Sequence, residues 1–165
     1  MDKKYEILND NCIIINGHKL FRIRALKDFQ TILGLTVKAG DLGGYIQSEK
    51  NLSQEGKAWV SDNARVYDNA KVFENAWVYE NAWVYDNAKV YGNTKVYSNA
   101  EVFENACVYG AACVYDVACV CDDAWVYGDA RVYGNACVGD NAQVFGNAVV
   151  CDNTEVLGDT LVQNA

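Results

Sequence analysis

The chain has 165 residues, enough for one domain, with a formal net charge of −8. No apolar run approaches the roughly 20 residues of a membrane-spanning helix, and no signal-peptide core follows the basic start, so we expect a soluble, cytoplasmic protein with no membrane partner. Residues 1–40 carry a net charge of +3 and the remainder −11. Such an acidic body repels a phosphate backbone, so a nucleic-acid polymer is not an expected partner.

The first 45 residues lack any repeat and contain three short apolar stretches. YEIL (5–8), CIII (12–15) and LFRIRAL (20–26) are typical of strands, and Asn16-Gly17 is a hairpin-turn pair. We expect residues 1–45 to form a small N-terminal β cap that covers the open edge of the next element. A glycine-rich join, GDLGGYI (40–46), leads into a second domain, residues 46–165, whose first coil is imperfect.

From residue 60 onward a six-residue period governs the sequence. Valine stands at every sixth position from 60 to 162, which gives eighteen hexads, and Ala or Thr lies two residues before each valine. Residues two apart in a strand share a face, so both places are expected to point inward. The residues on either side of each valine then point outward.

The last two residues of each hexad must turn the chain. The first is mostly Asp, Glu or Gly, and the second is Asn in twelve of seventeen complete hexads. Asn tolerates the left-handed backbone region, so we expect the Asn to occupy it. Three such corners close a triangle of eighteen residues, and the hexads predict an all-β fold of about six stacked parallel coils, spaced by roughly 4.8 Å.

The hexads resemble a known repeat family. An aliphatic residue with a small residue four places later, as in Val78 with Ala82, is similar to the hexapeptide-repeat proteins, a resemblance that implies a left-handed parallel β-helix over residues 58–165. The run HKLFRIRAL…VKAGDLGGYIQSEKNLSQEGKAWV resembles the head of YdcK-like proteins, many of them carried by bacteria and bacteriophages. That resemblance implies a cap followed by a β-helix and supplies no catalytic residue.

Enzymes of the resembled family depend on histidine: acyltransferases use one with a protruding loop, and carbonic anhydrases use three to hold zinc. This chain has one histidine, His18, in the turn NGHK. We interpret it as a solvated turn residue and expect no catalytic residue, no cofactor and no enzyme activity.

Seven cysteines, six of them at repeat positions, fit reduced thiols better than a disulfide framework. Cys119 and Cys137 are eighteen residues apart and Cys121 flanks the same valine as Cys119, so three thiols should share one wall. A soft-metal site would need a fourth ligand, which the pattern does not supply. We therefore interpret the cysteines as outward-facing strand residues and predict no metal site.

Residues eighteen apart place an aromatic ladder on one wall. It includes Phe73, Tyr91, Tyr109, Tyr127 and Phe145, followed by a corner rich in glycine that would let another surface approach. The ladder either stabilises neighbouring coils or forms an interface, and planar ligands could also stack there. The predicted binding residues are Lys71, Phe73, Lys89, Tyr91, Tyr109, Trp125, Tyr127 and Phe145.

The corner before this wall is acidic: Asp68, Asp86, Glu104, Asp122 and Asp140 recur at the same place. Their mutual repulsion could be relieved by Ca²⁺, but we prefer a solvated edge.

The last hexads predict self-association. The chain ends in LVQNA, so we expect copies to associate end to end as a symmetric dimer. The predicted interface residues are Val156, Leu157, Leu161 and Val162.

The function predicted from these features is non-catalytic: a rigid, aromatic-rich β-helix that binds a protein partner or assembles with itself. One alternative, from the resemblance to phage proteins, is an anti-defence protein that sequesters a small nucleotide signal. Another is a degenerate hexapeptide acyltransferase.

Overall fold

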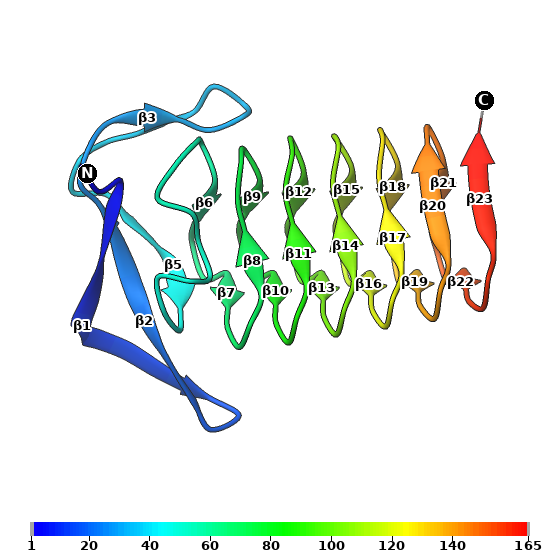
Figure 1. The fold of residues 1–165 in the computed structure, drawn as a ribbon, viewed down its shortest axis with the longest axis horizontal. Helices are drawn as coiled ribbons and strands as arrows, with labels where there is room; N and C mark the ends of the chain where they lie inside the picture. The colour runs from blue at the N-terminus through cyan, green and yellow to red at the C-terminus, as the bar shows by residue number, and fades with distance from the viewer. Residues whose placement is uncertain (1, 165) are drawn as a thin grey trace.

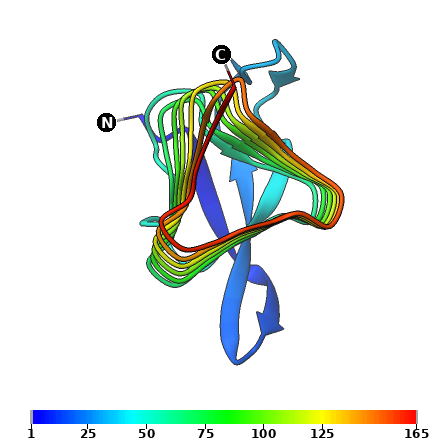
Figure 2. The same cartoon turned by 90° about the vertical axis from the view of Figure 1, so that its right-hand side faces the viewer.

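The computed structural model describes residues 2–164, and the regular elements in that range are β-strands. They form a parallel β-solenoid with a triangular cross-section (Figures 1 and 2). Within the described range, no helix is long and apolar enough to cross a membrane.

Three parallel sheets form the sides of the triangle, and we name them walls 1 to 3. Wall 1 contains β5 (Leu42–Ile46), β7 (Arg65–Val66), β10 (Trp83–Val84), β13 (Glu101–Val102), β16 (Cys119–Val120), β19 (Cys137–Val138) and β22 (Glu155–Val156). Wall 2 contains β8 (Lys71–Val72), β11 (Lys89–Val90), β14 (Cys107–Val108), β17 (Trp125–Val126), β20 (Gln143–Gly146) and β23 (Leu161–Asn164). Wall 3 contains β6 (Trp59–Val60), β9 (Trp77–Val78), β12 (Lys95–Val96), β15 (Cys113–Val114), β18 (Arg131–Val132) and β21 (Val149–Val150).

The register confirms the eighteen-residue coil. Val84 pairs with Val102 on wall 1, and Val90 pairs with Val108 on wall 2. The solenoid has about seven turns rather than about six, because the imperfect coil before residue 60 adds one: β5 pairs with β7, and Leu52 pairs with Val72. The left-handed sense of the coil stays a prediction.

The core consists of the inward places of the hexads. Every repeat valine from Val60 to Val150 is at most 3% exposed, and the alanines at the inward places, from Ala58 to Ala148, are fully buried. Burial of each valine contributes about 1.5–2 kcal/mol before the entropy of ordering is subtracted. Small and medium side chains are needed because three walls meet around a narrow axis.

The corner prediction was wrong about which residue is left-handed. The first corner residue, not the Asn that follows, has positive φ, as at Asp86 (56°), Glu104 (56°) and Gly128 (70°). The Asn side chains instead form ladders between turns: Asn87 Nδ2 donates to Asn105 Oδ1 at 3.1 Å. The Asn is therefore selected for its side-chain amide and not for its backbone.

Glycine at the corners beside wall 2 was predicted to let another surface approach, but the structure gives a different reason for it. A Cβ at Gly92 would lie 2.7 Å from the carbonyl oxygen of Gly110, and one at Gly128 would lie 2.9 Å from the nitrogen of Gly146. Glycine is thus required by the neighbouring turn of the same chain.

The N-terminal residues extend wall 1. β1 (Tyr5–Ile15) and β2 (His18–Ala25) form an antiparallel hairpin through a turn at Asn16 and Gly17, both with positive φ, as predicted. YEIL and CIII lie in one strand, interrupted by a register shift between Leu8 and Cys12. β2 pairs with β5, so the sheet of wall 1 has nine strands, and the hairpin projects outside the triangle (Figure 2).

Two features of this region were not predicted. A short hairpin forms between β3 (Phe29–Gln30) and β4 (Thr36–Val37). In addition, Lys4 is only 1% exposed, and its Nζ donates to the carbonyl of Ala58 at 2.7 Å, which ties the start of the chain to the first turn. The division into a cap of residues 1–45 and a helix of residues 46–165 stays a prediction.

Candidate functional site

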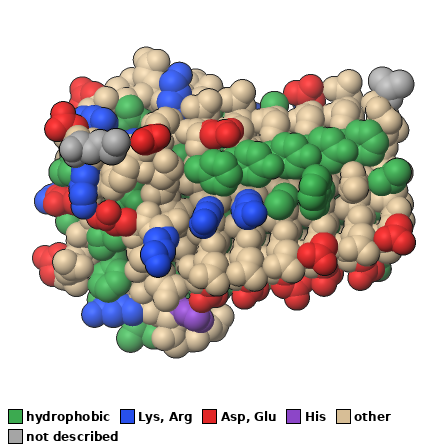
Figure 3. Space-filling model, viewed as in Figure 1, with side chains coloured by type: hydrophobic (Ala, Val, Ile, Leu, Met, Phe, Trp, Pro, Cys, Tyr) green, Lys and Arg blue, Asp and Glu red, His purple; other side chains and the backbone are tan. Residues whose placement is uncertain are grey.

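The aromatic ladder of wall 2 forms as predicted. Phe73, Tyr91, Tyr109, Tyr127 and Phe145 follow the buried valines of β8, β11, β14, β17 and β20, so their side chains point outward. Successive ring centroids are 4.7–5.1 Å apart and the ring planes are within 9° of parallel. Figure 3 shows them as one continuous hydrophobic row along the molecule.

A second outward column lies beside the rings. Lys71 and Lys89 pair in register and are exposed, and Trp125 is 44% exposed with its ring edge-on to Tyr109 at 6.1 Å. All eight predicted binding residues therefore gather on wall 2. The two outward columns of this wall contain no carboxylate from β8 to β23.

The hydroxyls of Tyr91 and Tyr109 stay neutral at physiological pH. Burial raises the pKa of Tyr91 and of Tyr109 above the ordinary value for a phenol. The charge on the outward columns of this wall therefore comes from the two lysines, while the rest is apolar or uncharged.

A hollow of about 460 Å³ lies at the N-terminal end of the ladder. It is lined by Phe73, Lys71, Lys50 and Leu52, among others. Because Leu52 pairs with Val72, Ser53 occupies the ladder place next to Phe73, and that face of the Phe73 ring has no aromatic neighbour. Sequence reasoning missed this hollow because the irregular first coil hides the register.

Ladders also form on the other two walls. Tyr67, Tyr85 and Phe103 stack on wall 1, and four tyrosines from Tyr79 to Tyr133 stack on wall 3. Stacking between turns is thus a general stabilising feature of this solenoid. Wall 2 differs from the others because it has the longest ladder in the described range. Wall 3, in contrast, is partly covered by the β3–β4 hairpin: Thr31 and Val37 share a hollow with Trp59 and Trp77.

His18 is not simply a solvated turn residue. It begins β2, its Nδ1 lies 3.2 Å from Asp68 Oδ1, and its ring packs on Tyr67 at 5.2 Å. These contacts fasten the hairpin to wall 1.

The acidic corner is organised by hydrogen bonds between turns. Asp86 accepts from the backbone N–H of Glu104 at 3.3 Å, and Glu104 accepts from Asp122 at 2.7 Å. Asp122 accepts from Asp140 at 3.0 Å, which lowers the pKa of its exposed carboxyl. Each of these carboxylates thus has a donor, so the ladder needs no cation to relieve it.

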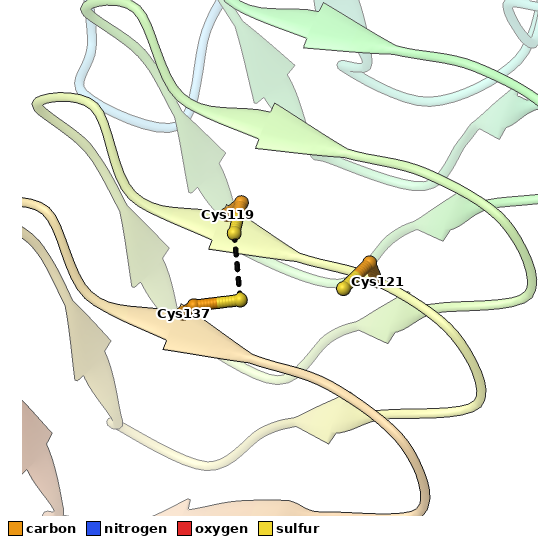
Figure 4. Close-up of side chains that lie close together, drawn as sticks. All are labelled: Cys119, Cys121 and Cys137. Atoms are coloured by element: carbon orange, nitrogen blue, oxygen red, sulfur yellow. Dashed lines mark hydrogen bonds between the residues drawn. The ribbon is translucent and has the colours of Figure 1, made fainter. Parts of the chain in front are cut away.

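The three thiols of wall 1 come together as predicted. Cys119 and Cys137 pair in register with their sulfur atoms 2.9 Å apart, and the sulfur of Cys121 points toward them (Figure 4). All three sulfur atoms lie within 4.8 Å of one another. The prediction missed one neighbour: Asp122 Oδ2 is 3.5 Å from Cys121 Sγ.

The four predicted interface residues lie on or directly after the last strands. Val156 is buried in β22 and Val162 is partly buried in β23, while Leu157 and Leu161 are 43% and 65% exposed. Association at this place stays a prediction.

Two segments of the chain, residues 64–80 and 124–140, match the family model described as the YdcK β-solenoid repeat. The chain is thus a β-solenoid that contains repeats similar to those of the YdcK β-solenoid model. No significant match was found among curated proteins.

Proposed function

We propose that this solenoid is a non-catalytic binding protein and that wall 2 is the surface that a protein partner covers. The observation that carries the proposal is the row of five stacked rings, with Trp125 beside it, on a flat sheet without outward carboxylates. Aromatic residues are enriched, and acidic residues depleted, in the cores of protein interfaces. Free thiols throughout the chain fit a cytoplasmic location.

The stacking geometry favours a protein over a planar ligand along the row. The interior rings of Tyr91, Tyr109 and Tyr127 have a neighbouring ring on both faces, so their edges are what a partner meets. A base or sugar ring needs an open face, whereas a protein surface can pack against edges. The rigid coil also reduces the ordering that binding would otherwise require.

The experiment is affinity isolation from the native host with two matched variants. Tyr109→Glu places a charge in the middle of wall 2, and Tyr115→Glu places it at the same hexad position on wall 3. We expect one partner, at a fixed ratio to the chain, that the wild type and Tyr115→Glu retain and Tyr109→Glu loses. Retention by Tyr109→Glu, or equal loss from both variants, would contradict the proposal.

The hollow beside Phe73 favours a second candidate, a small nucleotide ligand. It combines an uncovered ring face with the ammonium groups of Lys50 and Lys71, while its one carboxylate, Glu49, is paired with Lys3, so the hollow suits a planar anion, as the alternative of nucleotide sequestration requires. We would measure the melting temperature with a panel of nucleotides, using Phe73→Ala as the test and Lys95→Ala on wall 3 as the control. No increase with any nucleotide, or an equal increase in Phe73→Ala, would remove this candidate. No observation favours the third alternative, a degenerate acyltransferase.

A further inference from the structure

We propose that Cys119, Cys121, Cys137 and Asp122 form a binding site for a thiophilic divalent cation such as Zn²⁺ on wall 1. The site lies away from wall 2 and does not depend on the proposed partner surface. Its ligands come from two successive turns, so a bound ion would join them.

The ligand atoms are already close to a coordination shell. Zinc–sulfur bonds of about 2.3 Å place two thiolates of a tetrahedral site about 3.8 Å apart. The three sulfur atoms lie within 4.8 Å of one another, and the nearest pair, Cys119 and Cys137, is 2.9 Å apart. Rotation about the Cα–Cβ bonds can adjust these distances while the paired backbone of β16 and β19 stays in place.

The proposed fourth ligand is the carboxylate of Asp122, whose Oδ2 is 3.5 Å from Cys121 Sγ. In the structure this carboxylate groups with Cys121 and Glu104, and its Oδ2 also accepts the backbone N–H of Asp140, so its side chain must rotate to join Cys119 and Cys137. Three thiolates and one carboxylate form a tetrahedral donor set that zinc accepts and that the all-oxygen cations Ca²⁺ and Mg²⁺ do not prefer.

Gly139 lies one turn after Cys121 in the same outward column. Tyr67, Tyr85 and Phe103 fill the same ladder place on earlier turns, but this column continues as Cys121 and then Gly139. The backbone of Gly139 is outside the positive-φ region, so the chain path does not require glycine there. A Cβ at Gly139 would lie 3.0–3.2 Å from Asp122 Oδ2, Leu157 Cδ2 and Cys121 Sγ, so the absence of a side chain lets these three groups pack over the backbone.

Binding would exchange protons for the ion. Coordination requires thiolates, so the affinity is expected to fall as the pH is lowered. An ion held by the folded protein alone also stabilises it by mass action.

The experiment is titration of the reduced, chelator-treated full chain with Co²⁺, a spectroscopic substitute for Zn²⁺, followed by displacement with Zn²⁺. We expect one Co²⁺ per chain, a thiolate-to-cobalt charge-transfer absorption, the intense visible bands of tetrahedral cobalt, and loss of all of them on addition of Zn²⁺. Zn²⁺ should also raise the melting temperature of the wild type.

Variants separate this site from unspecific thiol binding. Cys121→Ala should abolish the tetrahedral spectrum, and Asp122→Asn, which keeps an oxygen for the Asp140 N–H, should weaken the binding. Cys113→Ala, at the same hexad place as Cys119 but on wall 3, should leave the spectrum unchanged.

Two results would overturn the proposal. One is the absence of a charge-transfer band in protein whose seven thiols are shown to be reduced. The other is a band that survives in Cys121→Ala or is lost equally in Cys113→Ala. If the isolated protein has lost two hydrogens through a Cys119–Cys137 disulfide and binds no cobalt after reduction, the pair is a redox couple and the metal site is refuted.

Discussion

At the scale of single residues, backbone preferences predicted where the corners lie but not which corner residue has the left-handed conformation. The alternation of Asn with Asp, Glu and Gly indicated a turn every six residues, and the turns form there. Preference alone assigned the left-handed conformation to Asn, whereas the structure assigns it to the preceding residue, such as Asp86. The same conformation occurs at Gly128 and Ser98, so it belongs to this corner place and not to one kind of side chain, while the Asn side chains form ladders between turns that exist only after the coils have stacked.

We predict that a Gly→Ala substitution lowers the free energy of unfolding by different amounts at two of the glycine corners. Gly158→Ala meets only the strain of a left-handed residue, because nothing lies within 4 Å of the added Cβ, and should lower the free energy of unfolding by about 1 kcal/mol. Gly128→Ala also forces a Cβ against Gly146 and should cost about 1–3 kcal/mol more. Urea denaturation of both variants measures the difference, and equal costs would show that the turns are not packed as closely as described.

The buried Lys4 predicts that the free energy of unfolding depends on pH. Burial, together with the charge of Lys27, lowers the pKa of Lys4 from 10.5 to about 8. Between pH 8 and pH 10.5 the unfolded chain therefore binds more protons than the folded chain, so raising the pH favours the folded state by up to about 3 kcal/mol. The stability of the wild type relative to Lys4→Met should rise across this window, and a pH-independent difference would contradict the burial of a charged Lys4.

At the scale of elements, each two-residue strand is stable only through its neighbours. Strands such as β11 and β14 are too short to persist alone, but each is hydrogen-bonded on both sides and each outward ring stacks on the next turn. The ladder could be predicted from sequence because eighteen-residue spacing is enough to place residues one above another. The open face of Phe73 could not, since it depends on the irregular loop before residue 60.

The ladder predicts that an interior ring contributes more stability than a terminal one. Tyr109 stacks between Tyr91 and Tyr127, while Phe73 stacks only on Tyr91. At about 0.5–1.5 kcal/mol for each aromatic pair, Tyr109→Ala should destabilise the chain by roughly that much more than Phe73→Ala. Chemical denaturation of the two variants checks this order, and a larger loss for Phe73→Ala would contradict it.

At the scale of the whole molecule, the six-residue period was enough to predict the fold, but contacts outside the repeat could not be predicted from it. The valine period predicted a strand and a corner every six residues, and the pairing of residues eighteen apart confirms the three-walled coil. The β3–β4 hairpin and the docking of His18 on Asp68 lie outside the repeat, so nothing periodic indicated them. The carboxylate beside Cys121 was also missed, because spacing places columns but does not orient side chains.

Self-association through the outermost strands is a prediction at this scale. β22 and β23 are terminal in their sheets. Leu157, directly after β22, and Leu161, on β23, have exposed side chains. If they form the dimer contact, light scattering should give twice the 18.3 kDa chain mass for the wild type and a single chain mass for Leu161→Lys. A monomeric wild type at tens of micromolar would exclude this interface.

The most direct test of wall 2 as a partner surface is site-specific photo-crosslinking in the native host. A photoreactive phenylalanine analogue would replace Tyr109 on wall 2 or, as the matched control, Tyr115 on wall 3; both rings are partly exposed and occupy the same hexad place. We predict one discrete crosslinked protein from position 109 and none from position 115. No crosslink from position 109, or the same products from both positions, would contradict the assignment of wall 2 as the binding surface.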